Sequence, residues 1–170
     1  MSGTQRILLL GYGNPGRCDD ALGPALAEAI EKMGIPGVVV DSDYQLVVED
    51  AHAVAHCDVA IFADADATGP EPFSFRRVEP TDDRIVGFST HSVSPTEVVT
   101  LAREMFGAKA VAFVLGIRGY MFEEFGERLS DKARENLAAA TTFIAQELRN
   151  GTFTEFPNGK TDNKQAGSRS

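Results

Sequence analysis

Long apolar runs, a secretory signal and paired cysteines are all lacking in this chain of 170 residues. No apolar segment approaches the roughly 20 residues that a transmembrane helix requires. The first residues run directly into a short strand-like segment, with no recognisable signal peptide before it. The two cysteines, Cys18 and Cys57, are therefore expected to be reduced thiols. These features together predict a cytoplasmic protein.

Positive charge is also scarce, and internal repeats are not visible. The chain has 16 lysines and arginines against 25 aspartates and glutamates, which gives a net charge of −9. Such a surface repels nucleic-acid phosphates and anionic membranes, so we expect neither as a partner. The length suits a single core, and we expect one domain over residues 1–150, a monomer, and a polar, disordered tail over residues 151–170.

Apolar runs alternate with amphipathic segments along the first 150 residues. The expected strands are Ile7–Leu10, Val38–Val40, Val59–Ala63 and Ala110–Leu115, with Phe73–Arg77 as a half-covered edge strand. Helices are expected at about 21–33, at about 47–55, after Ser94 and after Ser130. This order predicts a three-layer α/β/α sandwich around a mainly parallel twisted sheet of about five strands, with one antiparallel edge strand.

Helix starts are marked by capping residues. Ser94-Pro95-Thr96-Glu97 combines a capping serine, a proline at the first helical position and the glutamate of a capping box. At the first helix, Asp19 or Asp20 is expected to cap the start. Ligands bind such folds outside the carboxyl ends of the strands, which directs attention to loops near residues 11–20, 41–46, 64–70 and 116–124.

The first of these loops contains a glycine pattern typical of dinucleotide binding. The segment 11–16 reads G-Y-G-N-P-G after a strand, and Asp41 ends the second strand where a ribose-binding acid is found. A small nucleotide-binding domain is therefore one hypothesis. Asp19 and Asp20 count against it, because two carboxylates at the helix start would repel a pyrophosphate. We expect Asp19 to be a capping acid and Asp20 to have a second role.

Two further side chains favour a metal site at the same sheet edge. Asp64 ends the buried third strand, whereas Asp66 is expected to be a loop acid. His91 lies in a long segment without regular pattern, and such segments are often functional. Two carboxylates and one imidazole suit zinc or nickel and leave positions open for substrate or water.

Other residues offer competing readings. His52 and His56 are four apart on one expected helix face, which is expected to be solvated. Cys18 beside a helix start, with His91 and Asp64, is a third hypothesis, a thiol peptidase. The neighbouring acids would raise the pKa of that thiol and count against it. No G-x-S-x-G nucleophile turn is present.

The motif G-x-G-N-x-x-x-x-D-[DE]-x-x-G spans residues 11–23, with an aspartate ending the third strand and a histidine before the next helix. In these features, across about residues 6–149, the chain resembles the nickel–iron hydrogenase maturation endopeptidases. The resemblance implies a cytoplasmic enzyme that removes a C-terminal extension from the hydrogenase large-subunit precursor after nickel insertion. The family's metal-binding residues fall on Asp20, Asp64 and His91, and the nickel belongs to the substrate.

The sequence is compatible with two roles for the metal: it can polarise the scissile carbonyl, or it can activate a water molecule. Tyr44, Gln45 and Arg118 lie in loops at the expected sheet edge and are expected to hold the C-terminal peptide.

Overall fold

The computed structural model describes residues 5–83, 93–151 and 153, and these form one sheet flanked by helices. The strands are β1 (Ile7–Tyr12), β2 (Val38–Asp43), β3 (Val59–Asp66), β4 (Phe73–Val78) and β5 (Val111–Arg118). Their order in the sheet is β2-β1-β3-β5-β4, and only β4 is antiparallel to its neighbour. The predicted fold class is confirmed.

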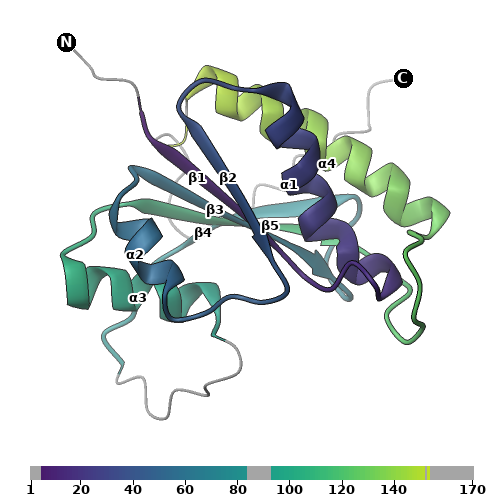
Figure 1. The fold of residues 1–170 in the computed structure, drawn as a ribbon, viewed down its shortest axis with the longest axis horizontal. Coiled ribbons are helices and arrows are strands. Elements are labelled where there is room, and N and C mark those ends of the chain that lie inside the picture. Colours follow the sequence, from purple (N-terminus) through teal and green to yellow (C-terminus); the bar gives the residue numbers. More distant parts are fainter. Residues whose placement is uncertain (1–4, 84–92, 152, 154–170) are drawn as a thin grey trace.

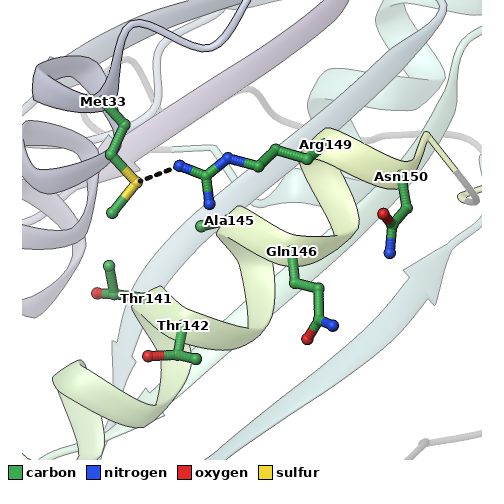
Figure 2. Close-up of a pocket in the computed structure, with 7 residues that line it drawn as sticks. All are labelled: Met33, Thr141, Thr142, Ala145, Gln146, Arg149 and Asn150. Atoms are coloured by element: carbon green, nitrogen blue, oxygen red, sulfur yellow. Dashed lines mark hydrogen bonds between the residues drawn. The ribbon is translucent and has the colours of Figure 1, made fainter.

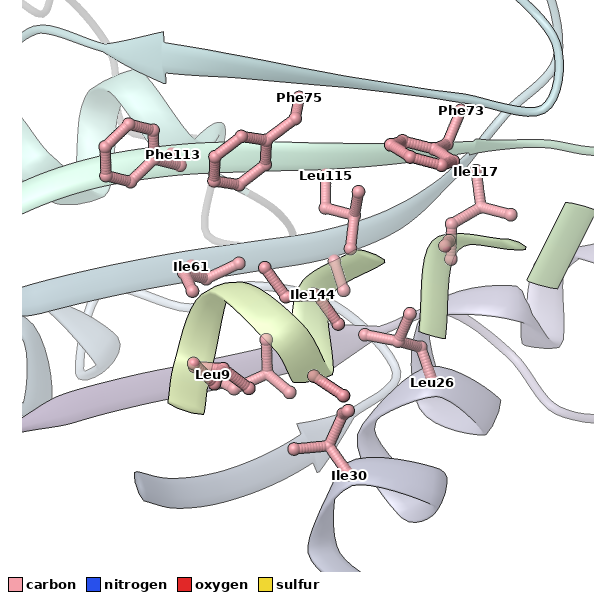
Figure 3. Close-up of a cluster of buried hydrophobic side chains, with 14 of the residues drawn as sticks. Leu9, Leu26, Ile30, Ile61, Phe73, Phe75, Phe113, Leu115, Ile117 and Ile144 are labelled. Carbon is pink, nitrogen blue, oxygen red and sulfur yellow. The ribbon is translucent and has the colours of Figure 1, made fainter. Parts of the chain in front are cut away.

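Helices cover both faces of the sheet. Figure 1 shows α1 (Leu22–Met33) and α4 (Asp131–Asn150) together on one side, with α2 (Asp50–Ala55) and α3 (Pro95–Phe106) on the other. Figure 3 shows the core under α1 and α4, where Leu26, Ile30 and Ile144 face strand residues such as Leu9, Ile61 and Leu115. Phe153, beyond α4, is also buried, with its ring centroid 5.8 Å from that of Phe113.

The predicted caps of the later helices are present. The Ser94 hydroxyl accepts a hydrogen bond from the Glu97 N–H at 3.2 Å, and the Glu97 carboxylate accepts one from the Ser94 N–H at 2.6 Å. The Ser130 hydroxyl likewise accepts a hydrogen bond from Ala133 at the start of α4. Each serine occupies backbone donors that the first helical turn leaves free, which fixes where its helix begins.

The start of α1 differs from the prediction. The N-cap position is Ala21, with no side-chain cap, and a short 3₁₀ turn η1 (Cys18–Ala21) precedes it. The prediction that Asp19 or Asp20 caps this helix is therefore wrong. Both carboxylates instead accept hydrogen bonds from loop residues, which compete successfully with the helix amides.

Three of the parallel strands run further than their apolar segments suggest. The strand β2 continues to Asp43, β3 to Asp66 and β5 to Arg118, because ladder pairing carries the polar residues along. Asp64 and Asp66, for example, pair with Gly116 and Arg118. Pairing with neighbours overrides the low strand preference of aspartate, so Asp64 lies within the sheet rather than in a loop.

The helix α1 packs unusually close to β1. A Cβ atom on Gly11 would lie 2.3 Å from the Gly23 carbonyl oxygen, so neither strand nor helix has room for a side chain there. This contact places η1 and the start of α1 directly at the carboxyl ends of β1 and β3. Among the described residues, no helix combines the length and apolar character needed to cross a membrane.

Candidate functional site

The carboxyl ends of the four parallel strands bring two of the predicted site residues together. Asp64 lies near the end of β3, and Asp20 lies in η1, close enough for its negative charge to act on Asp64. His91 lies outside the described residues. Its described neighbour Val93 donates a backbone hydrogen bond to the Leu46 carbonyl just beyond β2, at 3.4 Å. The chain therefore resumes at this same edge of the sheet.

The carboxyl of Asp64 holds its proton more tightly than an ordinary aspartate. The pKa of Asp64 is raised to about 7, mainly by burial and in addition by the negative charges of Asp20 and Asp66. Hydrogen bonds from the Ala65 N–H and the Tyr12 hydroxyl act in the opposite direction. Near neutral pH this carboxyl is therefore divided between its acid and its carboxylate form.

Tyr12 is a site residue that sequence reasoning missed. Burial raises the pKa of the Tyr12 hydroxyl, and the charge of Asp64 and their hydrogen bond raise it further. The phenol consequently stays protonated and donates to Asp64. The available signal was the position of Tyr12 as the last residue of β1, one strand away from Asp64; the glycines on either side drew attention to the turn instead.

Replacing Tyr12 by phenylalanine tests this pairing without any substrate. The variant removes a hydrogen bond that lowers the pKa of Asp64, so that pKa should rise above its value of about 7. A ¹³C NMR titration of the Asp64 carboxyl carbon measures it directly. An unchanged or lower pKa in the variant would contradict the assigned contact, and Tyr44→Phe serves as the control because Tyr44 is exposed.

The glycine loop is closed by the protein's own carboxylate. The Asn14 N–H donates to Oδ2 of Asp20 at 2.8 Å, and the Gly16 N–H donates to Oδ1 of Asn14 at 2.8 Å. Gly13 has a φ of 145°, and a Cβ atom there would lie 2.0 Å from the Asp20 carbonyl oxygen. The loop thus directs one N–H at the Asp20 carboxylate and another at the Asn14 side chain, where a nucleotide site would direct them at a phosphate. This geometry disfavours the nucleotide hypothesis.

Asp19 is the organising residue of the loop after β5. It is fully buried, and its carboxylate accepts hydrogen bonds from the N–H groups of Tyr120, Met121 and Ser130 and from the Ser130 hydroxyl, at 2.7–2.9 Å. Burial raises the pKa of Asp19, but these hydrogen bonds outweigh it and hold the pKa below the usual value of 3.8. Asp19 therefore acts as a buried anchor beneath the site.

Arg118, expected to hold peptide, is engaged within the protein. Its Nη1 donates to the Gly69 carbonyl at 2.6 Å, and its guanidinium lies 5.1 Å from the centre of the Tyr120 ring. The Tyr120 hydroxyl bonds to Glu71, whose carboxylate also pairs with Lys132 at 2.9 Å. The network ties the loops after β3 and β5 to α4. Asp66 was expected to be a loop acid, but it is the last residue of β3, and its carboxylate accepts hydrogen bonds from the Thr68 and Gly69 N–H groups of the loop that follows.

The two alternative sites, the His52/His56 pair and the Cys18 thiol, are less suited to binding a metal or attacking a substrate. The exposed rings of His52 and His56 lie 4.3 Å apart, and His56 Nδ1 lies 2.7 Å from the His52 carbonyl oxygen, so that nitrogen is occupied. Cys18 is buried, which closes its thiol to a substrate. Within residues 5–83, 93–151 and 153, no three histidine, cysteine or acidic side chains gather as a ready metal site.

A hollow of about 380 Å³ between α1 and α4 lies away from the sheet edge. Figure 2 shows it lined by Met33 and by residues of α4, and Arg149 donates toward the Met33 sulfur at 3.8 Å. Arg149 is the one charged residue among those lining it, and no acid or nucleophile pair faces it. This hollow is therefore not a candidate active site.

Comparison with known proteins gives matches in structure alone, because no family model and no curated protein matches the sequence. The NiFe hydrogenase maturation protease HycI from Thermococcus kodakarensis is 25% identical, with a TM-score of 0.65 over 87% of this chain and 95% of that one. The hydrogenase maturating endopeptidase HybD from E. coli is 22% identical, with a TM-score of 0.64 over 86% and 93% of the two chains.

A hydrogenase 2 maturation peptidase from a Thaumarchaeota archaeon is 19% identical, with a TM-score of 0.62 over 85% of this chain and 98% of that one. These structures have the same sheet and flanking helices, and this chain spans nearly their whole length. The resemblance indicated by the motif of residues 11–23 is thus confirmed, and the chain has the fold of the NiFe hydrogenase maturation proteases.

Proposed function

We propose that this chain is an endopeptidase that removes the C-terminal extension of a nickel–iron hydrogenase large-subunit precursor after nickel insertion. The similar solved structures, which are named as hydrogenase maturation proteases, support the reaction class. The observation that carries the proposal is the pairing of Asp20 with Asp64, whose pKa of about 7 is set by burial and by the Asp20 charge. An acid whose pKa is raised by burial and by a neighbouring charge, as that of Asp64 is, is typical of working sites.

In the proposed mechanism, Asp20, Asp64 and His91 bind the nickel that the precursor carries. Carboxylate and imidazole are both ligands that nickel accepts, and three of them leave coordination positions for the scissile carbonyl or a water. Nickel needs the ionised form of Asp64, so binding releases its proton. Affinity for the nickel-loaded precursor should therefore rise with pH until Asp64 is fully ionised, above about 7.

The raised pKa of Asp64 also offers a reason why the site would prefer the nickel-loaded precursor to the nickel-free one. Without metal, the ionised carboxylates of Asp20 and Asp64 would repel each other, and the proton on Asp64 relieves that repulsion. Nickel provides two positive charges in place of the proton and stabilises both carboxylates together. The proposal places the protein in the cytoplasm as a monomer, with the precursor as its partner.

A processing assay tests the function directly. The purified protein is mixed with large-subunit precursor from the same cells, either loaded with nickel or free of it, and the products are separated by gel. Loss of a short C-terminal peptide from the nickel-loaded form alone is the expected result. Cleavage of neither form, together with saturable micromolar binding of NAD or ATP in dialysis, would favour the nucleotide hypothesis instead.

His91→Ala should slow processing of the nickel-loaded precursor by roughly 100-fold or more, because a ligand acting as part of one unit is lost. His56→Ala is the matched control, since His56 is an exposed residue of another segment. Circular dichroism of both variants establishes that they fold. A His91→Ala protein that processes precursor at the normal rate would show that the site assignment is wrong.

A further inference from the structure

The strand β2 has an open edge. It is the last strand on one side of the sheet, and within the described residues it pairs with β1 alone. The Gly37 and Asp43 carbonyls face β1, where they accept hydrogen bonds from Ile7 at 2.9 Å and Gly13 at 3.1 Å. Backbone groups alternate in direction along a strand, so the N–H and C=O of Val40 point to the open side. An added strand can pair there.

A groove runs beside this edge. One hollow of about 610 Å³ lies between α1, the end of β2 and the loop near Leu129, and a second of about 170 Å³ lies beside Tyr44. Pro15, Pro24 and Ser42 line both, so the two are continuous.

The groove is negatively charged. Glu28, Glu31 and Glu127 line its larger part and Asp43 the smaller, and the described lining includes no lysine or arginine. Lys32 pairs with Glu28 at 3.0 Å, whereas Glu31 and Glu127 form no ion pair within the described part of the chain. A segment bearing positive side chains would be attracted to this groove, and an acidic one would be repelled.

The groove leads to the proposed catalytic residues. Gly13 lines its smaller part, and the next residue, Asn14, donates its N–H to the Asp20 carboxylate at 2.8 Å. A chain lying in the groove would therefore extend directly to Asp20. A peptidase needs its substrate in an extended form across the reacting groups, and strand addition to a sheet edge provides this through backbone hydrogen bonds.

We propose that the β2 edge and this acidic groove bind an extended, lysine- or arginine-bearing segment of the precursor as an added strand. The inference rests on the proposed function and names how that substrate is held. In such a complex the backbone pairs with Val40, while every second side chain enters the groove beside Glu31 and Glu127. The alternate residues pass over the other face of β2, where Val39 is 65% exposed.

The double variant Glu31→Lys/Glu127→Lys tests the role of charge. For nickel-loaded precursor, we expect KM to rise about tenfold with kcat changed less than about twofold, because the groove binds substrate without touching the reacting atoms. Glu104→Lys/Glu135→Lys, on exposed helix positions elsewhere, makes the same charge change and should leave KM unaltered. A precursor whose basic residues near the cleavage point are replaced by glutamate should reverse the preference between wild type and the groove variant.

Amide hydrogen exchange supplies a readout that does not need cleavage. Bound nickel-loaded precursor should slow exchange of the Val40 N–H in the wild-type protein at least about tenfold. A groove variant with the wild-type KM, together with unchanged Val40 exchange, would overturn the inference. So would slowed exchange in concentrated protein without precursor, because a second copy would then occupy the edge. Slowed exchange with no cleavage by the wild type would leave the docking site standing and reject the proposed function.

Discussion

The Asp64→Asn substitution should slow processing of the nickel-loaded precursor by roughly 1,000-fold. It should also raise the free energy of unfolding near pH 8. The loss of activity follows from the loss of an anionic ligand, because an amide is a weaker donor to nickel than a carboxylate. The gain in stability follows from removing a buried charge that the fold disfavours.

The sign of the pH dependence follows from the raised pKa of Asp64. Its ordinary value is 3.8 and its folded value is about 7, so between these pH values the folded state binds more protons than the unfolded state. Wild-type stability therefore falls as pH rises through this window and then levels off. The advantage of Asp64→Asn is absent below about pH 4 and complete above about pH 7, where we expect about 1–3 kcal/mol.

Urea unfolding of both proteins at about pH 4 and pH 8 measures the effect. Asp66→Asn is the matched control, because Asp66 accepts two loop hydrogen bonds and its loss should lower stability. If Asp64→Asn were less stable than the wild type at the higher pH, the Asp64 carboxylate would be stabilised by the fold, and the charge conflict with Asp20 would be refuted.

Asp19→Asn should lower the free energy of unfolding by about 3 kcal/mol or more, the second large effect. The asparagine NH₂ group must face N–H donors that now bond to a carboxylate oxygen, and the negative charge that strengthens all four bonds is lost. The loop after β5 loses its anchor, although Asp19 itself has no role as a metal ligand.

Acid unfolding distinguishes this role from a simple packing defect. The pKa of Asp19 is held below 3.8 by its hydrogen bonds, so its contribution is present above that pH and is lost as pH falls through the folded value. The wild type should therefore lose stability below about pH 4 more steeply than Asp19→Asn. Asp131→Asn, at an exposed acid of α4, is the control. Equal stability of Asp19→Asn and wild type would remove the anchor role.

Local patterns were sufficient for most of the fold. The apolar runs at Ile7–Leu10 and Val59–Ala63 predicted buried strands, because a parallel strand covered on both faces needs continuous apolar residues. The capping box at Ser94 predicted the start of α3 from four consecutive residues. Strand ends were predicted less well, because the pairing that extends β3 to Asp66 depends on β5, some fifty residues further along the chain.

The candidate site was likewise predicted in part from the sequence, and the rest depended on the tertiary structure. The sequence by itself determined that Asp20 and Asp64 lie near the carboxyl ends of strands that meet at one sheet edge, because strands joined by right-handed crossovers run parallel. Only the tertiary structure decided which of two adjacent aspartates is the anchor, because the partners of Asp19 lie 101–111 residues away. It also decided that Tyr12 and burial set the pKa of Asp64, since both effects arise from neighbours across the sheet rather than along the chain.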